Sequence, residues 1–600
     1  MSAARQTPLN FGASTAVLAA ASGAGPAITP RLADGEMGDA ASKAALDRLN
    51  LAVDELKART VAPYLRRAID CIGAEDPQAA AEAALKALAI DERSGLAWYL
   101  LAIAREKSGD FKSSVQCYES ALALLPNHAD IANDLGRLAF RLNMKPIAVQ
   151  LFAHYYAAHP DCAQGANNLA CAMRDLHDYA GAIRVLQPAI EANPESSPLW
   201  NTLGTILSEQ GDLKSALTFF DEALRFDEGF AKARYNRANT LLDLGDVETA
   251  LAECELAMTA AETPSDLAMM KLARSTMLFS LGRTGEGWDA YEVRLDQAFV
   301  DVTNFMVDRP RWTPESDLAG KSLLVVGEQG LGDEVSFATV IPEVLEALGP
   351  EGHLLLALEP RLIPLYERSF PGATIGGHST LLVDGHTIRG VPFIQDQNVL
   401  DLWAPLADLP RRFRRTIEDY PTRRGYLTAD PVRVEHWRGV LAELPGPKVG
   451  ILWKSLKLDG ARLRQFSPFE RWRPVLETQG VSFVNMQYGE CETELAQARE
   501  TLGLDIWTPP GIDLKNDLDD VGALSRALDL TIGPANATTN IAAACGADVW
   551  LISAPAAWPR FGTEGYPWYG QARVFTPPEV SAWDAVMAEV AGALAEWVAG

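Results

Sequence analysis

The spacing of hydrophobic and polar positions divides the chain into two regions with different periods. Through residues 39–300, small and apolar residues recur at helical spacing. From about residue 320 to the C-terminus, short apolar runs alternate with amphipathic stretches. Apolar runs that alternate with helical patterns are typical of parallel sheets. The pattern therefore predicts an all-α region followed by an α/β region.

The all-α region repeats about every 34 positions, the period of tetratricopeptide repeats. Its clearest unit begins at Gly95 and carries Trp98, Leu101, Ala102, Gly109, Tyr118, Ala121 and Pro126 at the expected offsets. Further units begin near residues 129, 163, 197 and 231, and weaker ones cover 61–94 and 268–294. Each unit is a helix pair that buries its apolar face only by stacking on its neighbours. The helical segment 39–60 is expected to cap this array.

One position in each repeat is a candidate for peptide binding. The residue before the motif leucine is expected to lie on the inner helix and to face a concave groove, and it reads Asp134, Asn168 and Thr202, with Asn236 near the equivalent place in the last unit. Stacked polar side chains of this kind can hydrogen-bond a peptide backbone without reading its sequence. A solvated groove without a ligand is the alternative.

Six strands are predicted in the α/β region: Ser322–Val326, His353–Leu358, Lys448–Trp453, Val481–Met486, Leu530–Gly533 and Val549–Ile552. Helices are predicted at 333–347, 435–444 and 585–598, and the arginine-rich segment 411–424 is predicted to be a hinge between two blocks. Two Rossmann-like lobes of this kind place a site in the cleft between them.

These boundaries predict five parts. They are a disordered tail (1–38), a tetratricopeptide domain with a capping helix (39–300), a linker (301–317), an N-terminal lobe (318–425), and a C-terminal lobe with the final helix (426–600).

Composition narrows the partners. The chain has 600 residues, a formal charge of −26, and seven scattered cysteines without metal-type spacing. The acidic charge argues against nucleic acid as the main partner. The cysteine pattern favours a reduced, cytoplasmic setting, and no segment has the length and apolarity of a membrane span. We also expect no metal, because no cluster of ligands is visible.

The first candidate for chemistry is the turn Gly330-Leu-Gly-Asp333, which follows a buried strand and opens a helix. Asp333 at the edge of a cleft can act as a general base toward an acceptor hydroxyl. Glu328 and Glu334 are neighbouring carboxylates that can take the same role. The alternative is that Asp333 only stabilises the first turn of the helix.

Two further segments are candidates for a phosphate site. Lys454 and Ser455 end a strand, and Arg462 and Arg464 follow closely. Such a cluster can clamp a phosphate, although surface charges on a loop are the alternative. The second segment contains the cap-type residues Asn536, Thr538, Thr539 and Asn540. They either cap a helix or form an anion site at its N-terminus. No histidine follows His436, which argues against histidine-dependent hydrolase chemistry in the second lobe.

Several runs carry a family resemblance: Gly285-x-Gly-Trp288 with Tyr291-Glu-x-Arg294, Pro310-Arg-Trp312, 318–333, Trp558-Pro-Arg560 and Tyr566-Pro-Trp-Tyr569. Together they resemble bacterial tetratricopeptide proteins with a heptosyltransferase-like GT-B domain, and most closely the flagellin glycosyltransferases of stalked bacteria. The resemblance implies that flagellin is the partner, that Asp333 is the base, and that the donor phosphate sits in the second lobe. It also implies inverting, metal-independent transfer of a nonulosonic acid, such as pseudaminic acid, from a CMP-sugar to Ser or Thr.

One departure from that family changes the expected donor. Where the family usually has an aspartate and, five residues on, a histidine, this chain has Ala535 and Asn540. A nucleoside monophosphate leaving group fits such a neutral pocket. Two alternatives remain open, namely an O-GlcNAc transferase-like enzyme that uses a UDP-sugar, and a repeat scaffold whose GT-B domain has decayed.

Overall fold

The computed structural model describes residues 40–383, 385–456 and 464–600. The predicted tail at 1–38 and the predicted phosphate ligand Arg462 lie outside the described residues. The chain forms two compact units, one ending at Glu195 and the other covering Ser196–Gly600. The division does not follow the predicted boundary near residue 300, because the last repeat units group with the α/β region.

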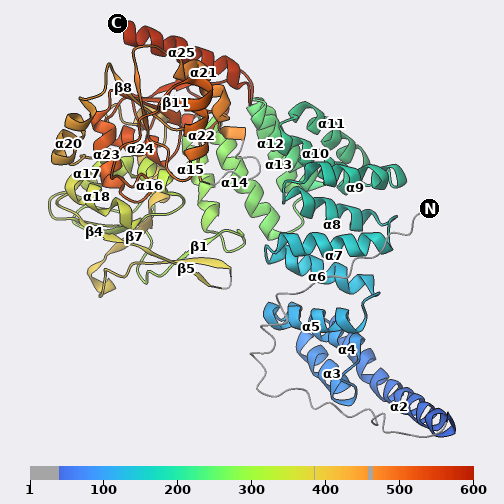
Figure 1. Cartoon of the computed structure of the whole chain (residues 1–600). Coiled ribbons are helices and arrows are strands. Elements are labelled where there is room, and N and C mark those ends of the chain that lie inside the picture. The colour runs from blue at the N-terminus through green and yellow to red at the C-terminus, as the bar shows by residue number, and fades with distance from the viewer. Residues whose placement is uncertain (1–39, 384, 457–463) are drawn as a thin grey trace. The chain divides into compact units, whose positions relative to one another are not determined.

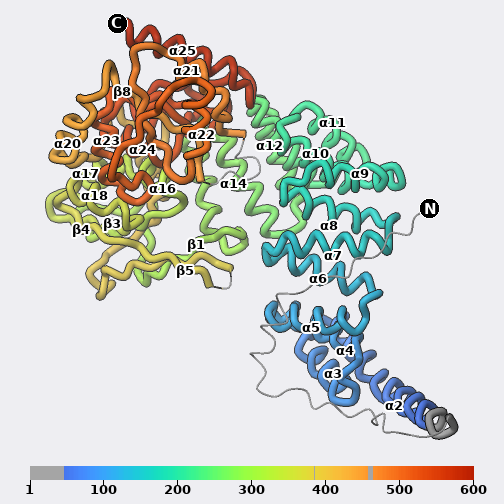
Figure 2. The backbone as a smooth tube through the Cα atoms, viewed as in Figure 1, coloured from blue at the N-terminus to red at the C-terminus, as the bar shows by residue number. Residues whose placement is uncertain are grey.

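The first unit consists of paired helices (Figures 1 and 2). They are α2 (Ala40–Gly73), α3 (Pro77–Ile90), α4 (Gly95–Lys107), α5 (Phe111–Leu124), α6 (Ala129–Arg141), α7 (Lys145–Ala158), α8 (Ala163–Arg174) and α9 (Tyr179–Ala192). The predicted capping segment is the first part of the longer helix α2. Helices α4, α6 and α8 begin at the residues that the repeat period predicts.

The second unit opens with three more helix pairs. They are α10 (Ser197–Gln210), α11 (Leu213–Phe226), α12 (Ala231–Asp243), α13 (Val247–Thr259), α14 (Pro264–Ser280) and α15 (Thr284–Tyr291), followed by the short 3-10 helix η1 (Glu292–Leu295). Aspartates cap the second helix of several pairs; Asp212 accepts a hydrogen bond from the Ser215 amide. Gly204 lacks a Cβ that would lie 2.7 Å from the Phe220 ring, so a small residue lets the paired helices approach.

Two parallel sheets follow. The first has the order β4-β3-β2-β7 and contains β2 (Ser322–Val326), β3 (His353–Leu358), β4 (Thr374–Gly377) and β7 (Leu402–Pro405). The second has the order β12-β11-β10-β8-β9 and contains β8 (Lys448–Ile451), β9 (Ser482–Asn485), β10 (Leu530–Pro534), β11 (Val549–Ile552) and β12 (Arg573–Phe575). The predicted parallel pairing is confirmed for both.

A third, smaller sheet was not predicted. It has the order β1-β6-β5 and joins β1 (Thr303–Phe305), from the predicted linker, to the antiparallel pair β5 (Ser379–Val383) and β6 (His386–Gly390). Its strands are short, and the apolar run of β5, residues 381–383, is exposed and not buried as in the central strands.

The α/β region contains ten α-helices among its described residues. They are α16 (Leu331–Phe337), α17 (Ile341–Leu348), α18 (Ile363–Ser369), α19 (Pro410–Phe413), α20 (Pro431–Leu441), α21 (Arg473–Leu476), α22 (Glu492–Gln497), α23 (Leu518–Ala527), α24 (Ala537–Ala544) and α25 (Trp583–Ala599). The helix predicted at 333–347 is thus two helices, and α20 and α25 are slightly longer than predicted. No helix in the described part of the chain is long and apolar enough to cross a membrane.

The core of the second unit joins its last repeat helices to the α/β region. Phe279 and Trp288 belong to the same buried cluster as strands β2 and β3. Trp288 contacts Trp568 edge to face and donates its indole N–H to the Tyr420 hydroxyl at 3.2 Å. The motifs 285–294 and 566–569 are therefore packing elements that fasten the last repeats to the sheets. In the predicted hinge at 411–424, Arg414 and Tyr420 are buried, and Arg414 donates to the Thr339 carbonyl.

Candidate functional site

A cavity of about 1140 Å³ lies in the second unit, where the strands of the two parallel sheets end. Turns that follow β2, β8, β9, β10 and β11 line it, together with the repeat helices α12 and α14. Asp333, which follows a strand of the first sheet, lies on its wall. Ser455 and Ser553, which follow strands of the second sheet, and Asp243 and Ser280 of the repeat helices also line it. The carboxyl ends of parallel strands are where α/β proteins bind ligands.

Asp333 lies on the wall of this cavity, in the first turn of α16. The Gly330 amide donates to its Oδ2 at 3.2 Å, so the carboxylate also caps the helix. The turn before it is strained, because Gln329 has a φ of 62°. Burial and the Asp333 charge raise the pKa of the neighbouring Tyr566 above its ordinary value, so that phenol stays neutral. Asp333 can therefore cap its helix and still present its carboxylate to the cavity.

The two neighbouring carboxylates are used in packing. Glu328 is 1% exposed and accepts two hydrogen bonds from Arg294, at 2.9 and 2.7 Å. Glu334 is 2% exposed; it bonds the His378 ring at 2.9 Å and accepts from the Glu359 amide at 2.9 Å. Neither side chain lines the cavity. Of the three candidate bases, the geometry leaves Asp333.

The second candidate turn, at the start of α24, caps its own helix. The Asn536 side chain accepts from the Thr538 and Thr539 amides, at 3.0 and 3.3 Å. The Thr539 hydroxyl accepts from the Asn536 amide and donates to the Pro534 carbonyl, and Thr539 is fully buried. Asn536 and Thr538 line the cavity, whereas Thr539 does not. Of the residues of this turn, Asn536 and Thr538 thus remain candidates for the predicted anion site.

Asn540 joins the two turns. Its Nδ2 donates to the Gly332 carbonyl at 3.3 Å, and the Tyr566 hydroxyl lies 3.5 Å from its Oδ1. A Cβ on Gly332 would lie 3.3 Å from the Ala537 backbone nitrogen. The glycine therefore allows helices α16 and α24 to meet end to end. Asn540, predicted to bind the donor, lines the cavity and also connects helix α24 to helix α16.

Of the predicted phosphate clamp, the structure describes Lys454, Ser455 and Arg464. Lys454 forms a close ion pair with Glu494, and Arg464 donates to Asp243 at 2.9 Å. Neither cation is among the described residues that line the cavity, whereas Ser455 is. The role of Lys454 and Arg464 in binding the donor phosphate therefore stays a prediction. Both side chains pair with acidic residues far away in the sequence, which the local pattern did not show.

Sequence reasoning missed several residues of the cavity. Among the described residues, its basic side chains are Arg361, Arg389 and Lys515, and Tyr488 and Ser553 lie at the ends of β9 and β11. Arg389 is 8% exposed and donates to the Gly327 carbonyl at 2.5 Å. The position of Tyr488 and Ser553 directly after predicted strands was the signal that could have found them.

The predicted groove residues form contacts between successive repeats. In the first unit, Asp134 accepts from the Tyr99 hydroxyl at 2.6 Å, and Asn168 donates to Asn133 at 3.3 Å. In the second unit, Asn236 donates to Asn201 at 2.9 Å. Thr202 is 3% exposed, which does not fit its predicted groove-facing role. Asp134, Asn168 and Asn236 are half-buried and keep part of their surface accessible.

Comparison with known proteins agrees with the repeat architecture. Tetratricopeptide repeat models match residues 95–128, 167–231 and 231–264. Protein FlbA of Caulobacter vibrioides is 51% identical over 587 residues, which cover 98% of both chains. Anaphase-promoting complex subunit 3 of Schizosaccharomyces pombe is 29% identical over 26% of this chain and 24% of its own. Among solved structures, the TPR protein YrrB is 23% identical, with a TM-score of 0.26 over 30% of this chain and 93% of its own.

Proposed function

The chain belongs to the FlbA family, and we propose that it is a flagellum-related protein O-glycosyltransferase with a GT-B catalytic domain. Its repeats bind flagellin, and its α/β region transfers a nonulosonic acid of the pseudaminic acid type from a CMP-sugar to Ser or Thr, in the cytoplasm. The observation that supports this proposal best is the cavity. It combines a carboxylate, Asp333, with strand ends of a second parallel sheet and with the last repeat helices.

The proposed reaction is a direct displacement that needs no metal. Asp333 takes the proton from the acceptor hydroxyl, whose oxygen attacks the anomeric carbon as the bond to the donor phosphate breaks. The sugar is transferred with inversion, and CMP leaves. In this scheme Asp333 and the donor phosphate lie on opposite sides of the sugar.

The leaving phosphate is proposed to lie against the second sheet. Ser455, Ser553, Asn536 and Thr538 line the cavity there, and all four side chains are neutral. Hydroxyl and amide donors in a closed site stabilise developing charge without a cation. Lys454 and Arg464 are paired with carboxylates, and the basic side chains among the described residues of the cavity wall are Arg361, Arg389 and Lys515. A single phosphate suits this wall better than the two phosphates of UDP.

Two alternatives make different predictions. An O-GlcNAc transferase-like enzyme would use a UDP-sugar, and a decayed GT-B domain would leave only a repeat scaffold. A thermal-shift panel with CMP, CMP-sugars, UDP and UDP-sugars separates them, because a ligand raises the melting temperature of the state it binds. Stabilisation by CMP compounds supports the proposal. Stabilisation by UDP compounds favours the first alternative, and no shift with any nucleotide favours the scaffold.

The partner is tested in cells. Flagellin is compared by intact mass between cells with and without this protein. We expect a loss of mass that corresponds to whole sugar-acid residues. An identical flagellin mass in both cells would remove flagellin as the acceptor.

A further inference from the structure

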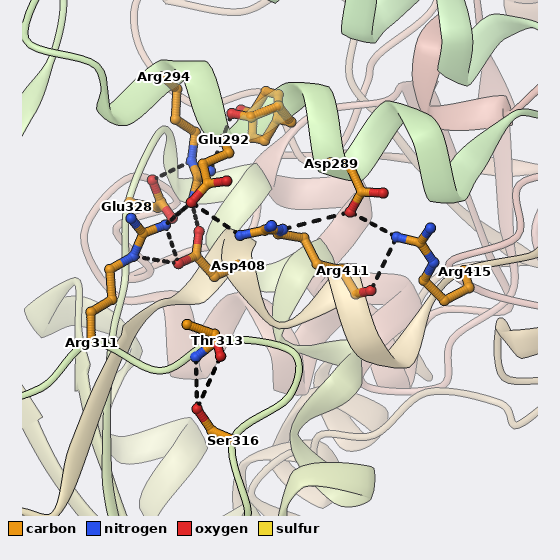
Figure 3. Close-up of polar contacts among 11 residues, drawn as sticks. Asp289, Glu292, Arg294, Arg311, Thr313, Ser316, Glu328, Asp408, Arg411 and Arg415 are labelled. Atoms are coloured by element: carbon orange, nitrogen blue, oxygen red, sulfur yellow. Dashed lines mark hydrogen bonds and ion pairs between the residues drawn. The ribbon is translucent and has the colours of Figure 1, made fainter.

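A buried ion-pair network connects the last repeat unit with the turn that carries Asp333 (Figure 3). Arg294, in η1 after the last repeat helix, donates through Nε and Nη2 to the two oxygens of Glu328, at 2.9 and 2.7 Å. The same Nη2 donates to Asp408 at 2.7 Å. The three side chains are at most 1% exposed. The guanidinium therefore spans three chain segments inside the core.

The side chain of Glu328 fixes the start of the turn in place. Its Oε1 also accepts from the Ala407 amide at 3.0 Å. Gly327, the preceding residue, is held through both backbone groups: its amide donates to Ala357 at 2.7 Å, and its carbonyl accepts from Arg389. The chain then passes through the strained Gln329 and enters α16. The direction in which the helix begins thus depends on the anchored residues before it.

Arg311 extends the network from Asp408 toward Glu292. Arg311 donates two hydrogen bonds to Asp408, at 2.9 and 2.6 Å, and its side chain is 32% exposed. Burial alone would lower the pKa of the Arg294 guanidinium, but Glu328 and Asp408 outweigh it and raise the pKa above its ordinary value. Removal of one partner from a buried set of this kind leaves an unpaired charge. The cation at position 294 is therefore required wherever Glu328 and Asp408 are ionised.

Shape matters as well as charge. A guanidinium is planar and pairs with a carboxylate through two parallel N–H groups, which fixes the orientation of both groups. A lysine ammonium has the same charge, but this charge is concentrated on one nitrogen and does not fix the orientation of the carboxylate. A residue that only neutralised the charge of Glu328 would not need the two parallel N–H groups that Arg294 provides.

We propose that Arg294 is a positioning residue through which the last repeat unit fixes the turn at 327–334 and thereby orients Asp333 toward the acceptor. This inference rests on the proposed role of Asp333 as the base. It makes the repeat arm part of the catalytic geometry, in addition to holding the acceptor.

The test compares Arg294→Lys with a matched control, Arg414→Lys. Arg414 has a side chain that is 1% exposed and pairs with Glu343, but it has no contact with the turn. Glu328→Gln serves as a second variant that keeps the side-chain shape, in case Arg294→Lys fails to fold. Hydrogen–deuterium exchange is measured on the full-length proteins. We expect amides in 327–334 to exchange ~10-fold faster in Arg294→Lys and Glu328→Gln than in the control. Unchanged exchange there would overturn the inference.

Transfer to flagellin is measured on the same proteins. We expect kcat to fall by ~10–100-fold in Arg294→Lys, with the KM for the CMP-sugar changed by less than about threefold, because a displaced base lowers the rate of the chemical step. Arg414→Lys should keep its kcat. A looser turn with an unchanged kcat would contradict the role in orientation. If exchange rises but the wild-type protein transfers no sugar, the turn is held by Arg294 as inferred and the proposed function is wrong.

Discussion

The two turns that meet at the cavity have the same topology, but different kinds of side chain hold them in place. Each follows a central parallel strand, β2 or β10, and opens a short helix, α16 or α24. The first turn has a cap of its own, Asp333, and is also held from outside, by Arg294 on Glu328 and by Arg389 on Gly327. The second is held from within, by Asn536 and Thr539 capping their own helix.

This difference separates two tasks. A turn anchored by buried charges of distant segments can present a carboxylate in one orientation, which a base requires. A turn that satisfies its own donors with amides and hydroxyls presents a neutral wall, which suits a weakly charged leaving group. The same strand–turn–helix unit thus differs mainly in the side chains that hold it.

The largest effect is expected from Asp333→Asn. Loss of a general base lowers transfer by ~10²–10⁴-fold. The matched control is Asp419→Asn, because Asp419 likewise accepts from the backbone amide of its own cap residue, Thr416, at 2.8 Å. Both variants weaken a cap, but only the first removes a carboxylate from the cavity. Equal activity in the two variants, measured as initial rates of flagellin modification, would show that Asp333 is only a cap.

A smaller effect is expected from Gly332→Val, which forces the two turns apart. A Cβ at this position would lie 3.3 Å from the Ala537 backbone nitrogen, and overpacking of this kind costs about 1–3 kcal/mol of unfolding free energy. We expect transfer to fall by ~10–100-fold, because the base and the donor wall separate. Gly439→Val, at a position with no heavy atom within 4 Å of the added Cβ, is the control. Urea unfolding and transfer rates that match between the two variants would contradict the close approach.

Asn540→Ala tests the bond between the turns. It removes the donor to the Gly332 carbonyl, and loss of one partner of a buried hydrogen bond costs about 1–3 kcal/mol. Thermal unfolding should detect this loss, with only a minor change in the donor affinity because Asn540 contacts protein groups. A large loss of CMP-sugar binding at unchanged stability would instead make Asn540 a donor ligand.

The smallest effect is expected from Lys454→Met. Because Lys454 pairs with Glu494, the KM for the donor should change by less than about threefold, and stability at neutral pH should fall by at most about 1 kcal/mol. A rise of more than about tenfold in KM would restore Lys454 to the phosphate site.

The same variant has a pH signature. Burial alone would raise the pKa of Glu494, but the hydrogen bond from Lys454 lowers it below its ordinary value. A lowered carboxyl pKa adds stability above the unfolded-state pKa of about 4.3, and this stability is lost as the pH falls through the folded-state value. The stability difference between wild type and Lys454→Met should therefore disappear in acid. A difference that persists there would mean that the ion pair is not its cause.

Much of this arrangement was predictable from the sequence, because it follows from local patterns. The repeat period located the helix pairs from Gly95 onward, and apolar runs located β2, β3 and β11 at their observed ends. The position of Asp333 on the cavity wall agrees with the expectation that a glycine-rich turn after a strand lies at a cleft, whereas its role as a base stays a prediction.

The partners of charged residues were not predictable in the same way. Lys454 and Arg464 form a cationic cluster in the sequence, but Glu494 and Asp243 pair with them in the fold. The Asn540–Gly332 bond joins residues 208 positions apart, which no local pattern reveals. Side chains that look available in a sequence are often satisfied by distant segments of the same chain.

The central claim is that Asp333 drives transfer of a CMP-activated sugar acid to flagellin. Purified protein, purified unmodified flagellin and CMP-pseudaminic acid are incubated together, and the flagellin mass is measured. We expect mass increments of whole sugar-acid residues with the wild-type protein and with Asp419→Asn, and none over the same time with Asp333→Asn. An unmodified flagellin after incubation with the wild-type protein, or equal increments with Asp333→Asn, would contradict the claim.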